Sequence, residues 1–150
     1  MTDVPFAAAA AGIRASLESQ GFTRLLAAEV VSVEPRVVVM ALDRRDEVLQ
    51  QNGLFHGGAT AYLVDNATTA AAATIIDREK RTVITAEYKI NLVAPSKGDR
   101  LTCRAEVVKP GRSLTVVEAK VYCRIDGAEK LVAVALATIA NLDIGRTAPE

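Results

Sequence analysis

The sequence is poor in the side chains that bind metal ions. It contains one histidine, His56, and two cysteines among its 150 residues. These are too few soft ligands for a structural zinc site. The glycine patterns of nucleotide-binding loops, G-x-x-x-x-G-K and G-x-G-x-x-G, are also absent. We therefore expect no metal site and no cofactor.

An excess of charge of one sign is missing as well. Lysine and arginine total 18, aspartate and glutamate also total 18, and there is no basic run, which argues against nucleic acid as the main partner. The alanine-rich stretch of residues 56–76 contains Asp65 and Asn66 near its middle and is too polar for a membrane span. The N-terminus lacks the positive segment of a secretion signal, so we expect a cytoplasmic protein without a membrane partner.

A serine nucleophile of the usual kind is not indicated either. None of the five serines lies in a G-x-S-x-G motif. The two cysteines, Cys103 and Cys123, fall inside strand-like runs, and we interpret them as small buried apolar residues rather than redox groups.

Half of the residues are hydrophobic, which favours a folded chain over a disordered one. Its length predicts a single domain over residues 1–150, with a core of about residues 22–142. The central stretch, residues 56–76, is rich in alanine and threonine and carries one charge. We predict that it forms a long helix beginning near Gly57 and buried on every side.

The remaining segments predict strands around that helix. A first helix runs from Pro5 to about Gln20, with Gly21 just past its end. After residue 82 the apolar period changes to two, with Ile84, Ala86, Tyr88, Ile90 and Leu92 on the predicted buried face and Thr85 on the polar face. The fold class is therefore α+β: a six-stranded antiparallel sheet wrapped around a long central helix, with an N-terminal helix. The expected strands are residues 25–33, 36–42, 82–92, 101–107, 114–125 and 131–142.

Two features of the central segment suggest chemistry. His56-Gly57-Gly58 opens the helix, where unpaired amide groups and the helix dipole attract a phosphate or a carbonyl oxygen. The alternative is that the glycines only permit tight packing. Asp65 is the one carboxylate of the predicted buried helix. It is either satisfied by the hydroxyls of Thr68 or Thr69, or it is a general base or nucleophile lining a cavity.

Gly57 and Asp65 are eight residues apart, which is about 12 Å along a helix axis. Both would have to lie within about 3 Å of a reacting atom. One helix cannot supply both groups, whereas two antiparallel helices in a two-fold dimer can. We therefore expect a homo-oligomer, a dimer or a dimer of dimers, whose sites are shared between chains.

At this point the residues resemble a known family. Q-x-x-G-x-x-H-G-G followed by L-V-D-N at positions 50–66 is similar to the phenylacetate-degradation-type (PaaI-type) acyl-CoA thioesterases of the hotdog-fold superfamily. The resemblance extends over about residues 45–142, through Tyr88-Lys89-Ile90-Asn91, Pro95 and Lys109-x-Gly111-Arg112. It implies the hotdog fold and hydrolysis of an acyl-CoA thioester to a free acid and coenzyme A.

The resemblance also implies roles for particular residues. Asp65 would activate water or attack the thioester, and the Gly57 amide would polarise the thioester carbonyl. His56 would orient the site, with Gly58 beside it against the substrate. The upstream polar residue of the family matches Gln50, with Asn52 nearby, and the assisting hydroxyl on the next strand matches Thr85.

Coenzyme A carries phosphates, so cations at the mouth of the site are expected. Four of them lie in or beside turns and are candidates for substrate binding. The four candidate cations are Lys97, Arg100, Lys109 and Arg112.

Two other functions stay open. One is a hotdog hydratase or dehydratase acting on an enoyl or hydroxyacyl thioester, and the other is a module that binds acyl-CoA without turnover.

Overall fold

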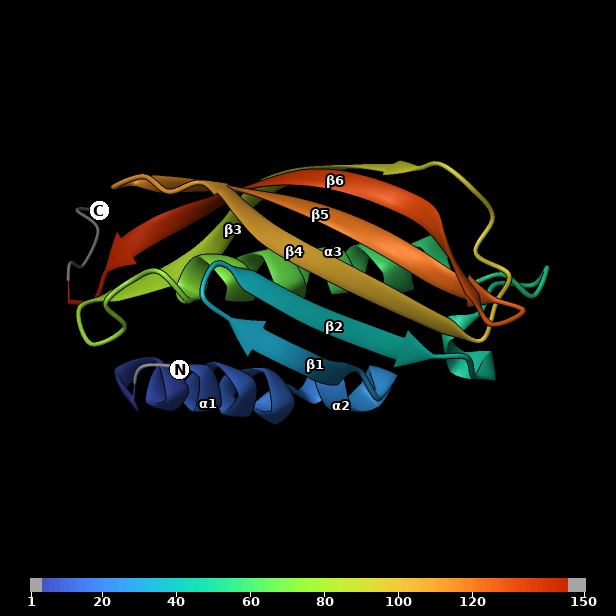
Figure 1. Ribbon diagram of the computed structural model, residues 1–150, viewed down its shortest axis with the longest axis horizontal. Helices are drawn as coiled ribbons and strands as arrows, with labels where there is room; N and C mark the ends of the chain where they lie inside the picture. The colour runs from blue at the N-terminus through green and yellow to red at the C-terminus, as the bar shows by residue number, and fades with distance from the viewer. Residues whose placement is uncertain (1–3, 146–150) are drawn as a thin grey trace.

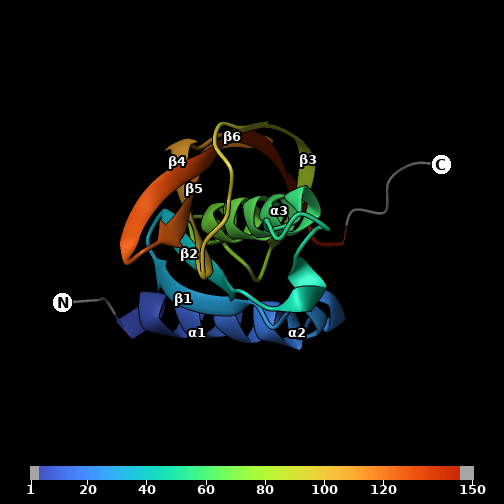
Figure 2. The ribbon, with the colours of Figure 1, turned by 90° about the vertical axis from the view of Figure 1, so that its right-hand side faces the viewer.

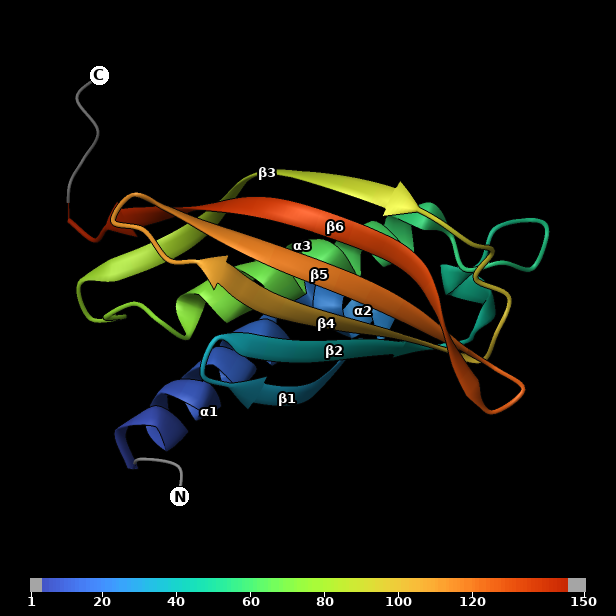
Figure 3. The same ribbon diagram turned by 45° about the horizontal axis from the view of Figure 1, so that its top comes forward.

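The computed structural model describes residues 4–145, and it has the predicted architecture: one curved antiparallel sheet holds a central helix, α3 (Gly57–Ala73) (Figure 1). Neighbouring strands pair antiparallel in the order β1-β2-β4-β5-β6-β3 (Figure 3). The other elements are α1 (Val4–Ser19), α2 (Gly21–Leu26), β1 (Glu29–Glu34), β2 (Val37–Asp43), the 3-10 turn η1 (Asp46–Val48), β3 (Arg81–Leu92), β4 (Arg100–Lys109), β5 (Leu114–Ile125) and β6 (Ala128–Asp143).

The curved sheet wraps around α3, and α1 and α2 lie beside β1 (Figure 2). The alanines of α3 let its backbone approach the sheet closely, because a helix–sheet contact through methyl groups needs little space. Leu63, Val64, Ala67 and Ala71 are fully buried. They pack in one hydrophobic core with inward-facing residues of the strands.

One stripe of α3 is not covered. Gly58 is exposed, and Ala61, Asp65, Thr69 and Ala73, which follow at four-residue intervals, are only half-buried. The prediction that this helix is buried on every side is therefore wrong for a single chain. The physical reason is topological: β1 and β3 are the two edges of the sheet, and they do not meet over this side of α3.

Strand β3 departs from the predicted alternation because it contains a bulge. Thr85 pairs with Ile139, but Glu87 pairs with Thr138, so Ala86 is an extra residue in the strand. A bulge shifts the phase of a strand by one residue and turns the side chains before it to the other face. Thr85 consequently points toward α3, whereas Ile84 is 55% exposed.

The start of the chain also differs from the prediction. Gly21 begins the short helix α2 instead of merely ending α1, and the predicted strand from residue 25 begins only at Glu29. Ala27, in the left-handed conformation with φ 51°, ends α2. The phenol of Tyr62 donates a hydrogen bond of 2.7 Å to the Thr23 hydroxyl, which attaches α2 to α3.

Both cysteines are buried and unpaired, as predicted. Burial raises the pKa of the Cys103 thiol to about 12, so this thiol stays protonated and unreactive at neutral pH. Among residues 4–145, no helix combines the length and apolarity that crossing a membrane requires.

Candidate active site

The first turn of α3 leaves one backbone amide without a partner. His56 is the N-cap, and its ring nitrogen Nδ1 accepts a hydrogen bond of 2.9 Å from the Gly58 amide. The His56 carbonyl accepts from the amides of Ala59, at 2.9 Å, and Thr60, at 3.3 Å. The Gly57 amide has no hydrogen bond within the part of the chain that the structure describes. It is therefore the donor that a ligand can use.

The two glycines serve different purposes. A Cβ atom at Gly58 would lie 3.0 Å from Nδ1 of His56, so this glycine makes room for the histidine cap. A Cβ atom at Gly57 would meet Leu92 at an ordinary contact of 3.5 Å. Among residues 4–145 no closer neighbour crowds Gly57, and its small size keeps the approach to its amide open. Since Nδ1 of His56 accepts a hydrogen bond, a neutral ring carries its proton on Nε2.

The carboxylate of Asp65 is held by hydroxyl groups. Its Oδ1 accepts a hydrogen bond of 2.6 Å from Oγ1 of Thr85, which lies 2.7 Å from Oγ1 of Thr69. Because the Thr85 proton goes to Asp65, the Thr69 hydroxyl must donate to Thr85. The Thr68 hydroxyl instead donates to the backbone carbonyls of Val64 and Asp65, at 2.8 and 3.2 Å. Neither of the two expected threonines therefore caps this carboxylate directly.

Thr69 was expected only as a possible direct partner of Asp65, and in the structure it lies behind Thr85 in this chain of hydroxyls. Its i, i+4 spacing from Asp65 was the available signal. Its contact with Thr85 was not expected, because the alternation placed Thr85 on the polar face of β3, whereas the bulge at Ala86 turns this side chain toward α3.

Gln50 lies beside Gly57. Both line a cavity of about 250 Å³, together with Thr60 and the loop after β3. The side-chain Oε1 of Gln50 accepts a hydrogen bond of 2.7 Å from the backbone amide of Asn52. Asn52 itself is exposed and does not line this cavity. The remaining lining residues are Leu54, Phe55, Leu92, Ala94, Pro95, Ser96 and Val132.

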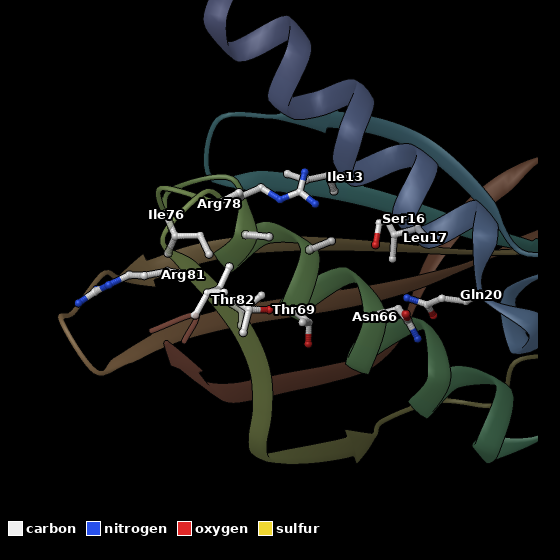
Figure 4. Close-up of a pocket in the computed structure, with 14 residues that line it drawn as sticks. Ile13, Ser16, Leu17, Gln20, Asn66, Thr69, Ile76, Arg78, Arg81 and Thr82 are labelled. Carbon is white, nitrogen blue, oxygen red and sulfur yellow. The ribbon is translucent and has the colours of Figure 1, made fainter. Parts of the chain in front are cut away.

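A second cavity, of about 260 Å³, lies at the Thr69 end of the Asp65 hydroxyl chain. Thr69 is part of its wall, and α1, α3 and the first residues of β3 enclose it (Figure 4). Thus each half of the predicted site, the amide of Gly57 and the carboxylate of Asp65, has its own neighbouring cavity.

The four candidate cations do not lie together: Lys97 is at one end of the sheet, Lys109 and Arg112 are at the other, and Arg100 is held in ion pairs. Lys97 is exposed in the loop that contacts Phe55, near the start of α3. Lys109 and Arg112 are exposed at the turn between β4 and β5, where Arg81 donates a hydrogen bond of 2.9 Å to the Arg112 carbonyl. That turn lies at the other end of the sheet (Figure 3).

Arg100 is engaged elsewhere in the protein. Its guanidinium forms ion pairs with Glu29 and with Asp43, the latter at 2.7 Å, and these carboxylates raise the pKa of Arg100. A guanidinium that already holds two carboxylates has little capacity left for a phosphate. In the single chain Arg100 links β4 to β1 and β2.

Taken together, one chain presents a free amide at the start of α3 and a hydroxyl-held carboxylate about 12 Å further along the same helix. An amide donor and a carboxylate are the two elements that acyl transfer from a carbonyl compound requires. The hotdog fold and these two candidate groups fit an enzyme that acts on an activated acyl group.

Comparison with known proteins agrees with this class. The model of the thioesterase superfamily matches residues 52–130. A 1,4-dihydroxy-2-naphthoyl-CoA hydrolase of Listeria monocytogenes serotype 1/2a (strain 10403S) is 32% identical over 120 residues, which are 80% of this chain and 94% of that protein. The chain therefore belongs to the thioesterase superfamily and is a thioesterase of the hotdog fold.

Solved structures show the same relationship. A thioesterase family protein from Silicibacter pomeroyi superposes with a TM-score of 0.86 and 34% identity, over 92% of this chain and 98% of that one. The PaaI protein of the E. coli phenylacetic acid degradation operon superposes with a TM-score of 0.72 over 85% of this chain and 88% of its own. At 18% identity this second likeness concerns the fold alone. The predicted resemblance to hotdog thioesterases is confirmed.

Proposed function

We propose that this thioesterase hydrolyses an acyl-CoA thioester to a free acid and coenzyme A. The observation that supports the proposal is that α3 carries two complementary groups. The Gly57 amide has no hydrogen-bond partner, and the Asp65 carboxylate, on the open stripe of α3, is held by a hydroxyl group. The name of the Listeria relative, a hydrolase of a CoA thioester, supports coenzyme A as the thiol.

In the proposed reaction the thioester carbonyl oxygen accepts a hydrogen bond from the Gly57 amide. This hydrogen bond strengthens as negative charge develops on the oxygen. Asp65 removes a proton from water as the water attacks the carbonyl carbon, or the carboxylate attacks that carbon itself and water then hydrolyses the anhydride. The carbon–sulfur bond breaks, and the thiolate of coenzyme A leaves and takes up a proton. Thr85 keeps one carboxylate oxygen oriented and leaves the other for the attacking water.

The two groups belong to one site only if two chains cooperate. In a two-fold dimer with antiparallel α3 helices, Gly57 of one chain faces Asp65 of the other. The open stripe of α3 provides the surface for this contact, and the free edge of β3 lies beside it. The same arrangement brings the Lys97 end of one chain to the Arg112 end of its partner. The separated cations would then gather around one coenzyme A.

Among the alternatives, hydration of an enoyl thioester needs a histidine and a carboxylate on neighbouring substrate carbons. Nδ1 of His56 is committed to the Gly58 amide, which weakens this candidate. An assay with an enoyl-CoA distinguishes it directly, because hydration consumes the double bond without releasing thiol. A binding module without turnover would release no thiol from any acyl-CoA.

Complementation between two inactive variants tests the shared site. Gly57→Pro replaces the amide proton with a pyrrolidine ring at the first helical position, where proline is tolerated. His56 has φ −64° and ψ 138°, a conformation compatible with a following proline. The second variant is Asp65→Ala, and Gly57→Ala serves as the control that adds a side chain but keeps the amide.

Co-refolding the two inactive variants in equal amounts makes about half of the dimers mixed. In a mixed dimer one site carries both defects and the other carries none, so about a quarter of all sites should be intact. Thiol release near a quarter of the wild-type value supports the shared site. No recovery, with mixed dimers demonstrated by mass spectrometry, would mean that each chain supplies both groups to its own site.

A further inference from the structure

Two side chains from other strands hold the turn between β4 and β5, residues 110–113. Nη1 of Arg81, at the start of β3, donates a hydrogen bond of 2.9 Å to the Arg112 carbonyl. Nδ2 of Asn141, near the end of β6, donates one of 2.8 Å to the Gly111 carbonyl. Figure 3 shows the turn beside the start of β3 and the end of β6. The turn is therefore held by contacts with distant parts of the chain as well as by its own two strands.

Both of these side chains are themselves fixed. Asn141 is only 9% exposed, and its Nδ2 also lies 3.1 Å from the hydroxyl of Thr115, which is fully buried. Nε of Arg81 forms an ion pair of 3.1 Å with Asp143, the residue opposite it on β6. Polar networks in which each side chain has more than one partner are rigid. Arg81 and Asn141 therefore hold the turn in one position.

The carbonyl groups of three successive turn residues are all engaged. Besides those of Gly111 and Arg112, the Ser113 carbonyl accepts a hydrogen bond of 2.8 Å from the Asn141 amide. The amides of the same three residues donate to no acceptor within residues 4–145, and all three residues are exposed. Successive backbone amides of a turn that are left without an acceptor form a concavity that binds anions.

The side chains of the turn suit an anion as well. A Cβ atom at Gly111 would lie 2.3 Å from the Leu114 carbonyl oxygen, so only glycine fits the turn without a shift of the backbone. Arg112 and Lys109 are exposed, and neither forms an ion pair within the described residues 4–145. A phosphate group carries several charged acceptor oxygens, so it can bind backbone amides and a cationic side chain at the same time.

We propose, building on the thioesterase function, that Arg81 and Asn141 are positioning residues for substrate binding. They hold the β4–β5 turn so that its three free amides and Arg112 bind a phosphate group of the acyl-CoA thioester. Because Arg81 and Asn141 engage the carbonyl groups of the turn, its amides are left for the ligand. Neither residue takes part at the thioester carbonyl. Loosening the turn therefore weakens binding of the phosphorylated substrate and leaves the chemical step unchanged.

Two substrates with and without phosphate separate this role from a general effect on stability. One is an acyl-CoA that the enzyme cleaves, chosen from acetyl-, butyryl-, octanoyl- and benzoyl-CoA. The other is the N-acetylcysteamine thioester of the same acyl group, which has no phosphate. Asn141→Leu combined with Thr115→Val replaces two polar partners by apolar groups of similar shape, which is nearly neutral for the fold.

This double variant should raise KM for the acyl-CoA by about three- to tenfold, the value of one hydrogen bond. Its kcat, and its KM for the N-acetylcysteamine thioester, should stay at the wild-type values. Thr115→Val alone is the matched control, because it keeps the hydrogen bond from Asn141 to Gly111. An equal change of KM for both thioesters would mean that Asn141 supports the fold and does not position the turn for phosphate.

Arg81→Met removes the other contact and should raise KM for the acyl-CoA by a similar factor of about three- to tenfold. Arg81→Lys keeps the charge and a donor and should recover part of this loss. The matched control is Arg36→Met, because Nη2 of Arg36 also donates a hydrogen bond of 2.9 Å, but to the Val107 carbonyl, outside the turn. If Arg36→Met raises KM as much as Arg81→Met does, the contact with the turn has no special role.

Titration with adenosine 3′,5′-bisphosphate gives a readout that does not depend on turnover. The amide NMR signals of Gly111, Arg112 and Ser113 should shift most, the double variant should bind this probe about three- to tenfold more weakly, and adenosine should cause no such shifts. The inference is overturned if the shifts concentrate outside residues 109–113, or if the double variant has the wild-type KM for the acyl-CoA. Absence of thiol release from every acyl-CoA would instead overturn the proposed function, and the titration would still test the phosphate site.

Discussion

The first turn of α3 and the middle of α3 hold their candidate catalytic groups in opposite ways. At the first turn a backbone amide is left free, and the side chain that organises this turn, His56, is two residues from its partner Gly58. In the middle the candidate group is the side-chain carboxylate of Asp65, and its partner Thr85 lies on β3, 20 residues away. The position of the hydrogen-bond donor, the Gly57 amide, is therefore determined by local sequence. The position of the acceptor, the Asp65 carboxylate, depends on the register of strand β3. Substitutions at each place should therefore have distinguishable effects on the reaction.

The largest effect is expected for Asp65→Asn. An amide cannot take a proton from water, and a general base contributes about 10²–10⁴-fold to the rate, so kcat should fall by at least about a hundredfold. The fold should persist, because Asp65 is half-buried and Asn is of similar size. Thiol release and a thermal unfolding curve measure both quantities. An Asp65→Asn variant as fast as the wild type would make Asp65 a structural residue.

Removing the N–H donor of Gly57 should lower kcat somewhat less than Asp65→Asn does. Gly57→Pro should lower kcat by about 10²–10³-fold, the usual cost of losing one donor to a developing oxyanion. Gly57→Ala keeps the amide and should retain most of the activity that Gly57→Pro loses. If Gly57→Ala and Gly57→Pro are equally impaired, space at Gly57 and not its amide proton is what the reaction needs.

The same distinction explains what could be predicted from the sequence. The start of α3 and the succession of strands along the chain follow from local patterns: an alanine-rich run that begins with H-G-G, and alternating residues such as those of β4. The face of β3 on which the Thr85 side chain lies could not be predicted. One extra residue, Ala86, moves the side chains of the preceding part of the strand to the opposite face. Period-two patterns do not reveal where such a bulge falls.

The burial of some surfaces in a single chain could not be predicted either. Apolarity indicated that α3 is covered on all sides, yet its stripe is only half-buried at Asp65. Leu136 of the largely apolar strand β6 is likewise 52% exposed. Composition reports that a surface prefers to be buried, but it does not tell whether the same chain or a second copy buries it. Short helices such as α2 are also hard to predict, because a few residues carry little periodicity.

Thr85→Val should affect the Asp65 carboxylate and leave the Gly57 amide unchanged. Valine keeps the shape of threonine but leaves Oδ1 of Asp65 without its 2.6 Å hydrogen bond. Hydrogen bonds to charged groups contribute about 1.5–3 kcal/mol, so kcat should fall by roughly tenfold to a hundredfold at nearly constant KM. Thr85→Ser restores a hydroxyl and should recover most of the loss. Equal activity of the valine and serine variants would show that the hydroxyl does not position Asp65.

The smallest effect is expected at the edge of the proposed site. The Arg112 side chain is exposed at the β4–β5 turn, so its attraction to a phosphate is screened by solvent and salt. Arg112→Ala should raise KM for acyl-CoA by about two- to fivefold, more at low than at high ionic strength, and leave kcat unchanged. The control is Arg104→Ala, since Arg104 is paired with Glu106 at 3.1 Å.

A substrate series identifies the group that Arg112 contacts. If Arg112 binds the 3′-phosphate of coenzyme A, its substitution should have no further effect on KM for an acyl-dephospho-CoA, which lacks that phosphate. If the diphosphate is the contact, the KM ratio between variant and wild type stays the same for both thiols. Unchanged KM for both substrates would remove Arg112 from the site and would leave the Lys97 end of the partner chain to hold the nucleotide.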